Sequence, residues 1–384
     1  MKYFVVAGEA SGDLHASGLI ARIREADSGA EFGIIGGELM SKAAGVEPLI
    51  RYDELNVMGF SEVLRNARRL LKLLKRARKL MLAYRPDALV LVDYPGFNLK
   101  LAKEAHKAGI KTHYFISPKI WAWKEWRIKA IKRDVDHMYS ILPFEVDWYK
   151  SRHDYDVDYV GNPTVGEMDK VMTHIPPVEH FLSRIGIDND RRGIIALLPG
   201  SRRGEVRNNL PLMIEAAKRF PDFQYIVAAA PSLPLSFYRE VAQDPGLKVT
   251  FGTTNVLVKE SRAALVTSGT ATLETALLGV PQVVCYRANG SKISYKIMEK
   301  LLKVKYVSLP NLIANDAVVP ELLVYKCTVD SIATELEALL SPSPKRDAQL
   351  AGYKLIRRRL GGDDATANAA KLIVERSGNT ASEA

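Results

Sequence analysis

The sequence is poor in residues that cross-link chains or bind metals. It has only two cysteines among 384 residues, Cys285 and Cys327, and no CxxC spacing, which argues against a disulfide framework or a cysteine metal site. The seven histidines form no HExxH or HxH motif, so we expect no zinc site. No apolar run reaches the roughly 18 residues needed to cross a bilayer. The first run, Tyr3–Ala7, is too short for a signal peptide and predicts a strand. Together these absences predict a cytoplasmic protein without a metal or other cofactor.

Acidic residues are in deficit, which gives a net charge of +10 and favours anionic partners, although excess lysine also serves solubility alone. Residues 65–79 contain no acid at all. Apolar residues recur there at helical spacing: Leu64, Ala67, Leu70, Leu71, Leu74, Ala77 and Met81. We predict a helix whose apolar stripe packs inward and whose basic face meets anionic lipid headgroups, with a merely solvated basic face as the alternative. With the apolar segment just upstream, the predicted membrane contacts are Val57, Met58, Phe60, Arg65, Arg68, Arg69 and Lys72.

Short apolar runs alternate with helical patterns along the whole chain, which is typical of parallel sheets built from βαβ units. The predicted strands are 3–7, 32–35, 88–92, 112–116, 138–142, 157–160, 194–198, 224–228, 248–251, 264–267 and 282–285. A Gly-Asn-Pro-Thr segment and nearby prolines indicate a boundary near residue 165. We predict two Rossmann-like domains facing a cleft, residues 1–165 and 166–344. The segment 345–384 is predicted to be helical and to return to the first domain.

Small residues follow the first predicted strand in the segment Gly8-Glu9-Ala10-Ser11-Gly12-Asp13. They would let a ligand approach the backbone of Ser11 and Gly12, and Ser11 or Asp13 could cap the helix that follows. The segment is neither GxGxxG nor a Walker loop, which gives no support for a dinucleotide or P-loop site. A tight capped turn is an equal alternative, but the carboxylate of Glu9 at the end of a strand is well placed to meet a sugar hydroxyl.

Two loops in the second half have the composition of a nucleotide diphosphate site. In the first, Gly200 and Ser201 give an open turn, and Arg202 can make two parallel bonds to phosphate. In the second, hydroxyls and amides lie at a predicted helix start, and Glu274 one turn later could hold a ribose. The alternative is two capped helices and a surface arginine. The residues of the second loop are Ser268, Gly269, Thr270, Ala271 and Thr272.

Asp93 ends the apolar run 88–92 and precedes Pro95. In an open parallel sheet this position faces the ligand crevice. A half-buried carboxylate there would have a raised pKa and could act as a general base, while capping of the next turn is the alternative.

Aromatic and basic residues alternate in Trp121, Trp123, Lys124, Trp126 and Arg127. The pattern suits base stacking on nucleic acid, but a substrate wall or domain packing explains it at least as well. The Asp-x-Asp spacings of residues 154–158 run into a predicted strand, so their side chains would diverge across its two faces. We therefore predict no magnesium site there.

The motifs taken together resemble those of the lipid-A-disaccharide synthase family of glycosyltransferases. They occur in the family's order over about residues 3–375, which single chance matches would not do. The segments that carry the resemblance are AGEASGD (7–13), VMG (57–59), VDYPGFN (92–98), SPKIWAW (117–123), LPFE (142–145), LPGSR (198–202), SGTATLE (268–274) and YVSLPN (306–311).

The resemblance implies a GT-B fold and an inverting transfer of a sugar from UDP-2,3-diacylglucosamine to 2,3-diacylglucosamine 1-phosphate, without a metal. It implies that Asp93 is the essential carboxylate, our candidate general base, and that Glu9 is a second important acid. It further implies that Arg202 binds the diphosphate, Glu274 the ribose, and that Asn311 lies near the donor phosphates. Many relatives have histidine where this chain has Asn162, to which we assign no catalytic role.

The resemblance also suggests a homodimer that exchanges its C-terminal helices, and peripheral attachment to the inner face of the inner membrane. Other classes of protein compete with this interpretation. A UDP-GlcNAc 2-epimerase or a MurG-like transferase would share the architecture. A basic nucleic-acid-binding protein would leave the loops around Arg202 and Glu274 unexplained, and a membrane scaffold would not need Asp93.

Overall fold

The computed structural model describes residues 1–55, 63–187, 193–267, 269–287, 305–362 and 364–378, with the backbone alone for 63–68. The chain forms two compact units. Unit 1 comprises Met1–Pro163 together with Asp363–Ala384, and unit 2 comprises Thr164–Gly362. The predicted segment 345–384 is divided between them, because its first helix belongs to unit 2 and its second to unit 1.

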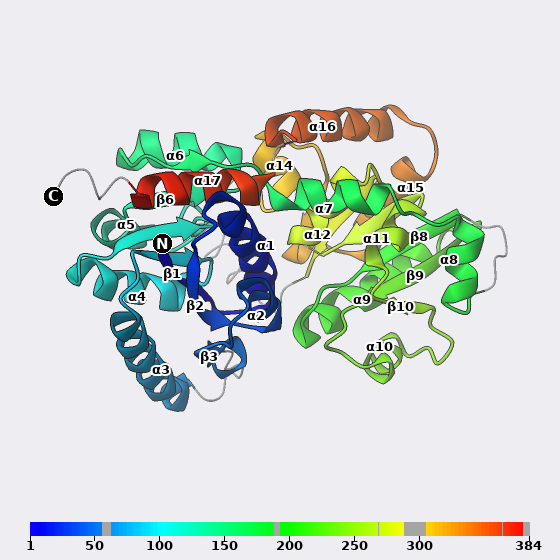
Figure 1. Ribbon diagram of the computed structural model, residues 1–384. Helices are drawn as coiled ribbons and strands as arrows, with labels where there is room; N and C mark the ends of the chain where they lie inside the picture. The colour runs from blue at the N-terminus through cyan, green and yellow to red at the C-terminus, as the bar shows by residue number, and fades with distance from the viewer. Residues whose placement is uncertain (56–62, 188–192, 268, 288–304, 363, 379–384) are drawn as a thin grey trace. The chain divides into compact units, whose positions relative to one another are not determined.

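Unit 1 is built on a parallel seven-stranded sheet in the order β3-β2-β1-β4-β5-β6-β7 (Figure 1). Its strands are β1 (Lys2–Ala7), β2 (Glu31–Gly36), β3 (Ile50–Arg51), β4 (Ala88–Val92), β5 (Lys111–Phe115), β6 (His137–Ser140) and β7 (Asp158–Tyr159). Its helices are α1 (Ala10–Ala26), α2 (Glu38–Ala44), α3 (Val63–Tyr84), α4 (Pro95–Lys107), α5 (Ile128–Asp134), α6 (Pro143–His153) and α17 (Ala365–Gly378), with short turns η1 (Tyr52–Glu54) and η3 (Glu125–Arg127).

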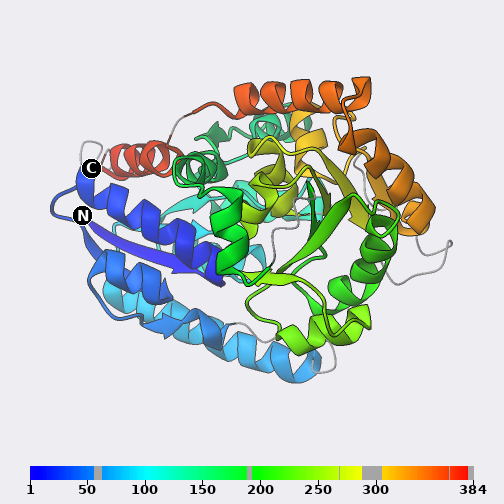
Figure 2. The same ribbon diagram turned by 90° about the vertical axis from the view of Figure 1, so that its right-hand side faces the viewer.

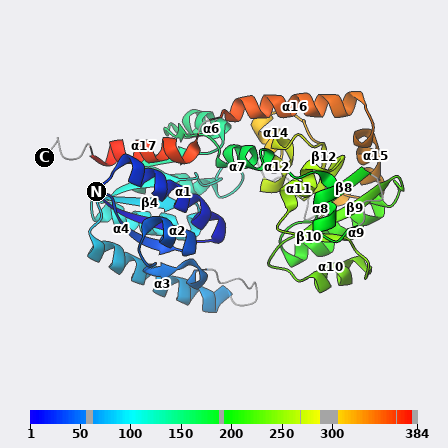
Figure 3. The ribbon, with the colours of Figure 1, turned by 45° about the vertical axis from the view of Figure 1, so that its right-hand side comes forward.

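Helices cover both faces of this sheet, as its continuous apolar strands require. One buried cluster joins the sheet to α3, α4 and α5, and a second joins it to α1, α2 and α17. Figure 3 shows α17 and α1 on one side of β4 and α3 and α4 on the other. The C-terminal helix α17 lies beside α1 (Figures 1 and 2), where Arg376 pairs with Asp158 and Arg22 pairs with Asp364 at 2.6 Å.

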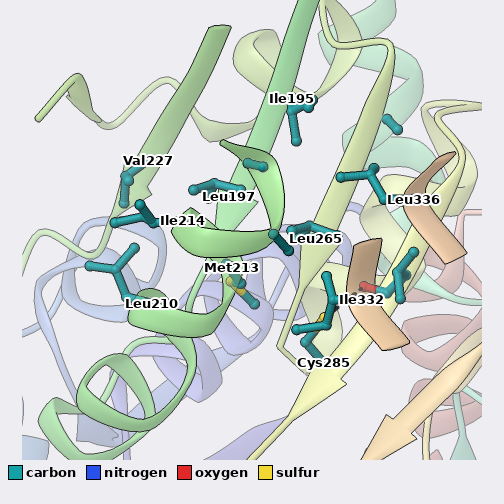
Figure 4. Close-up of a cluster of buried hydrophobic side chains, with 14 of the residues drawn as sticks. Ile195, Leu197, Leu210, Met213, Ile214, Val227, Leu265, Cys285, Ile332 and Leu336 are labelled. Atoms are coloured by element: carbon teal, nitrogen blue, oxygen red, sulfur yellow. Dashed lines mark hydrogen bonds between the residues drawn. The ribbon is translucent and has the colours of Figure 1, made fainter. Parts of the chain in front are cut away.

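Unit 2 contains a parallel six-stranded sheet in the order β10-β9-β8-β11-β12-β13. Its strands are β8 (Gly193–Leu198), β9 (Phe223–Ala229), β10 (Val249–Phe251), β11 (Ala263–Val266), β12 (Gln282–Tyr286) and β13 (Glu321–Leu323). Its helices are α7 (Pro163–Met172), α8 (Val178–Arg184), α9 (Arg203–Ala217), α10 (Leu235–Ala242), α11 (Thr254–Lys259), α12 (Thr270–Leu277), α14 (Leu309–Ala314), α15 (Val329–Leu340) and α16 (Pro344–Leu360), with the turn η4 (Val324–Lys326). Figure 4 shows its core, where Leu197 and Leu265 of the sheet meet Met213 of α9 and Ile332 of α15.

All eleven predicted strands are present, with bounds that differ by at most two residues. The short edge strands β3 and β13 were not predicted from the sequence. The predicted parallel α/β fold class is confirmed.

The inward stripe predicted for helix α3 is wrong at Leu71. Ala77 and Met81 are buried as predicted, but the buried face continues through Leu73. Leu71 lies two residues earlier, about 200° around the helix, and its side chain is 51% exposed. Helix α3 therefore presents an apolar residue among its cations. Among the described residues, no helix is both long and apolar enough to cross a membrane.

Candidate active site

The strand order of unit 1 reverses between β1 and β4, which pair directly although two strands separate them in the sequence. Ligands of open parallel sheets bind outside the carboxyl ends of the strands at such a reversal. Glu9 follows β1 and Asp93 follows β4, so both predicted acidic residues lie at this point. The fold therefore brings together two carboxylates that are 84 residues apart in the sequence.

Asp93 is held in an unusual backbone conformation at the end of β4. Asp93 and Tyr94 both have φ of 47°, in the left-handed region that L-residues rarely adopt. The amide of Asp93 donates to the Phe115 carbonyl at 3.0 Å, and its own carbonyl accepts from Asn98 Nδ2 at 2.7 Å and from the Tyr114 hydroxyl at 2.5 Å. These contacts fix the backbone of Asp93 at the ligand edge of the sheet. Such strain persists where the surroundings impose it, typically at active sites.

The electrostatic surroundings of Asp93 suit a proton acceptor. Burial raises the pKa of the Asp93 carboxyl above its ordinary value, the positive charge of Lys119 opposes that rise, and the negative charge of Glu9 adds to it. Glu9 in turn accepts a hydrogen bond from the Ser11 hydroxyl at 2.9 Å. A carboxylate with a raised pKa binds a proton more readily, as general-base catalysis requires.

The turn after β1 is packed closely against this residue pair. A Cβ atom on Gly8 would lie 2.1 Å from the Tyr94 ring, and one on Gly12 would lie 3.3 Å from Cβ of Ala7. Glycine at both positions therefore lets α1 begin directly against β1 and Tyr94. The predicted caps of α1 are wrong, because Glu9 occupies the N-cap position. The buried carboxylate of Asp13 instead accepts from the amides of Gly37 and Met40, at the start of α2, at 2.6 and 3.3 Å.

In unit 2 the strand order reverses between β8 and β11. Gly200, Ser201 and Arg202 follow β8, and Gly269, Thr270 and Ala271 follow β11. The two predicted diphosphate loops are thus neighbours at the ligand-binding edge of their own sheet. Ser268 lies outside the described residues.

The loop after β8 already holds an internal carboxylate. Glu205 Oε2 accepts from the amides of Ser201 and Arg202 at 3.1 and 3.2 Å, and Oε1 accepts from Arg202 Nη1 at 2.9 Å. Gly200 has φ of 104°, and a Cβ there would lie 2.6 Å from Glu205 Oε2. The Arg202 side chain is 74% exposed, so its other guanidinium N–H groups can reach a ligand.

The loop after β11 leads into helix α12. Some of the predicted ligand-binding residues at the start of this helix are exposed, and others are buried. Thr270 is exposed at the helix start and Glu274 is half-buried one turn later. Burial raises the pKa of Glu274, and the charge of Glu167 on α7 adds to the effect. Thr272 is fully buried and its hydroxyl donates to the Gly269 carbonyl at 2.8 Å, so it shapes the turn and does not offer the ligand contact that the sequence suggested.

The side chain of Asn311 forms hydrogen bonds with neighbouring residues of unit 2. Its Nδ2 donates to the Val319 carbonyl and to Glu321, both at 2.9 Å, and its Oδ1 accepts from the Val319 amide at 2.8 Å. Glu321 further accepts from the amide of Ser308 at 2.8 Å. Both N–H groups of the Asn311 side chain thus donate within the protein, and Asn311 fixes the start of α14. That Asn311 lies near the donor phosphates stays a prediction.

The profile described as lipid-A-disaccharide synthetase matches residues 3–374. The chain belongs to this family. It is 40% identical over 380 residues to the lipid-A-disaccharide synthase of Myxococcus xanthus and 35% identical to that of Geobacter sulfurreducens, covering 97% of both chains in each case. The chain is therefore a glycosyltransferase of lipid A disaccharide synthesis.

Solved structures agree on the fold of this lipid-A-disaccharide synthetase family member. A UDP-GlcNAc 2-epimerase from Neisseria meningitidis, solved with UDP-GlcNAc, superimposes with a TM-score of 0.67 at 14% identity, covering 98% of this chain and 99% of that one. The calicheamicin glycosyltransferase CalG4 gives 0.59, also at 14% identity, covering 99% and 98%. Identities this low show the shared GT-B fold alone. The family match and the relatives favour neither an epimerase, nor a MurG-like transferase, nor a nucleic-acid-binding protein.

Several residues that shape the family member's site were not assigned roles from the sequence. Glu145 is buried and accepts from the hydroxyls of Ser117 and Ser140 and from Trp121 Nε1 at 2.7 Å. The positive charge of Lys119 lowers the pKa of Asp93, and the Glu205 carboxylate accepts a hydrogen bond from the Ser201 amide in the loop after β8. The positions of Lys119 and Glu145 inside the family's motifs were the available signal, whereas Glu205 lies three residues beyond its nearest motif.

Asn162 is buried, and its Nδ2 donates to the Ile141 carbonyl at 2.9 Å, which ties the end of β7 to β6. Asp154 and Asp156, of the segment with Asp-x-Asp spacing, both pair with Lys150. Within the described ranges, no cluster of three or more His, Cys, Asp or Glu could hold a metal ion.

Proposed function

We propose that the protein transfers the acylated glucosaminyl group of UDP-2,3-diacylglucosamine to the 6-hydroxyl of 2,3-diacylglucosamine 1-phosphate. The Asp93 carboxylate takes the hydroxyl proton while the oxygen attacks the anomeric carbon. The bond from that carbon to the diphosphate oxygen breaks, and its electron pair leaves with UDP. Attack opposite the leaving group gives the β-1′,6-linked disaccharide 1-phosphate. The position of Asp93, strained and desolvated at the β1–β4 reversal, is the observation that carries the proposal.

Unit 2 supplies the donor side of this proposal. Arg202 binds the diphosphate, with the Gly200 amide, the Ser201 hydroxyl and the segment Ser268–Thr270. Glu274 takes the ribose hydroxyls. Cations and helix N-termini stabilise the negative charge that develops on the departing UDP. A cation of this kind performs the role that a divalent metal has in other transferases, so the reaction needs no added metal.

Product formation from the two acylated sugars, with EDTA present, tests the function. We expect the purified protein to form the disaccharide and to release one UDP for each product molecule. An epimerase would instead convert UDP-GlcNAc without an acceptor. Folded protein that forms no disaccharide would contradict the proposal.

The pKa of Asp93 predicts how the rate depends on pH. The base works as a carboxylate, so kcat/KM must fall as the pH drops through its pKa. Because burial raises that pKa, we expect the acidic limb of log kcat/KM to lie above the pH of an ordinary aspartate, near 3.9. Initial rates across pH 4 to 9 measure the limb. Values of kcat/KM that stay level down to pH 4 would argue against Asp93 as the base.

We further propose that helix α3 binds the inner face of the inner membrane. Arg69 and Lys72 are exposed beside the exposed Leu71, a combination that suits an anionic interface. Val57, Met58 and Phe60, and the side chains of Arg65 and Arg68, lie outside the described residues. We expect stronger co-sedimentation with phosphatidylglycerol vesicles than with phosphatidylcholine vesicles. Equal recovery on the two kinds of vesicle would contradict the proposal.

The homodimer with exchanged C-terminal helices stays a prediction, which a monomer mass from light scattering would contradict.

A further inference from the structure

The loop between β5 and α5 carries three cations at the same sheet edge as Asp93. Lys119, Lys124 and Arg127 lie in this loop, which begins next to Asp93 because β4 and β5 are paired. In the part of the chain that the structure describes, no carboxylate lies within salt-bridge distance of any of the three. The nearby acid Glu125 pairs with Arg152 at 2.5 Å instead. The loop therefore concentrates positive charge without neutralising it.

The backbone on both sides of Lys119 is fixed by buried contacts. The Glu145 carboxylate binds Ser117 on one side and Trp121 on the other, and the Tyr149 hydroxyl donates to the Pro118 carbonyl at 2.8 Å. Ile116, at the start of the loop, has φ of 67°, which is rare for a β-branched residue. A backbone that is fixed by hydrogen bonds and strained, and that carries an exposed lysine, is typical of a preorganised binding site.

The other two cations are held together although their charges repel. Lys124 Nζ lies 3.9 Å from the centre of the Trp123 ring, and Arg127 Cζ lies 6.0 Å from the centres of the Trp123 and Trp126 rings. Burial and the charge of Arg127 both lower the pKa of Lys124. Cations kept together without an acidic partner attract a multiply charged anion such as phosphate.

We propose that Lys119, Lys124 and Arg127 bind the phosphate of the acceptor, an acylated sugar phosphate. The inference rests on the proposed function. It assigns the phosphate to the acceptor because the cations lie in unit 1 beside the proposed base, whereas the diphosphate loops lie in unit 2. The residues Trp123 and Trp126 are 58% and 69% exposed, and their indole rings give an acylated ligand an apolar surface next to the cations.

The test compares Lys119→Gln/Lys124→Gln with the control Lys100→Gln/Lys129→Gln, which removes the same charge from exposed positions on α4 and α5. Rates are measured in neutral detergent micelles on the pH plateau, because losing Lys119 also raises the pKa of Asp93. We expect the acceptor KM of the double variant to rise about 10-fold or more. The donor KM of the variant, and both KM values of the control, should change less than about twofold.

A second acceptor, 2,3-diacylglucosamine without phosphate, shows whether phosphate is the group recognised. The variant and the wild type should use it equally well, since the lost contacts have no partner on it. The inference is overturned if the variant loses as much activity with this acceptor, or if its acceptor KM is unchanged. It is also overturned if the variant loses only recovery on phosphatidylglycerol vesicles, which would assign the cations to membrane lipids. Wild-type protein that makes no disaccharide would instead mark the failure of the proposed function.

Discussion

Replacing Asp93 with asparagine should lower kcat by at least ~100-fold, the low end for loss of a general base. Asparagine has nearly the same shape but cannot accept the proton of the acceptor hydroxyl. It also tolerates positive φ better than most residues, so the turn at φ of 47° should survive. Disaccharide formation at saturating concentrations of both substrates measures the effect, and thermal unfolding should show little change.

Asp147→Asn is the matched control for this variant, since Asp147 is exposed on α6 in the same unit. Its activity should stay within about twofold of the wild type, as surface changes generally have little effect. If Asp93→Asn keeps wild-type activity, the family assignment stands but the base lies elsewhere. Glu9 would be the first candidate, because its charge already acts on Asp93.

Replacing Arg202 with methionine should reduce kcat/KM for the UDP-sugar by about 10- to 100-fold, the range for losing a hydrogen bond to a charged group. Methionine keeps an unbranched apolar stem but removes the donors to the diphosphate. Because Arg202 already pairs with Glu205, part of its binding energy replaces that contact, which places the expected loss below that of a wholly unpaired arginine. Steady-state kinetics with varied donor, and calorimetric titration with UDP, measure the effect.

Arg203→Met is a matched control because the neighbouring Arg203 is also exposed, but its guanidinium lies over the Phe237 ring, 4.6 Å from the ring centre. Donor kinetics of this variant should be close to those of the wild type. Equal losses in the two variants would indicate a general electrostatic effect of the helix start. An unchanged kcat/KM for the UDP-sugar in Arg202→Met would remove Arg202 from the diphosphate site.

The sequence predicted the sheets well because each strand has a local signal. The run Ala88–Val92 is apolar throughout, as expected of a strand buried on both faces, and it appears as β4 with the same bounds. The positions of Glu9, Asp93 and Arg202 followed from the same logic, since each lies in the segment that follows such a run. Residues adjacent in the chain suffice for these predictions.

Local sequence patterns could not predict contacts between residues that are far apart in the chain. Asp13 was predicted to cap its own helix, yet it caps α2, whose first residues come 24 positions later. Helical spacing placed Leu71 on the inward stripe, but the centre of the buried face depends on how α3 docks against the sheet. Sequence spacing shows that a helix has an apolar face, and packing decides where the edge of that face lies.

The sequence by itself determined the order of strands and helices, the family, and the chemical types of the candidate residues at the strand ends. The tertiary structure decided which of these residues meet: Glu9 with Asp93 at one reversal of strand order, and the loops after β8 and β11 at the other. It also decided the unassigned roles of Glu145, Glu205 and Lys119. The physical reason is that strand propensity and periodicity act between near neighbours in the chain. Burial, backbone strain and charge at a site depend on residues that only the packed sheets bring together.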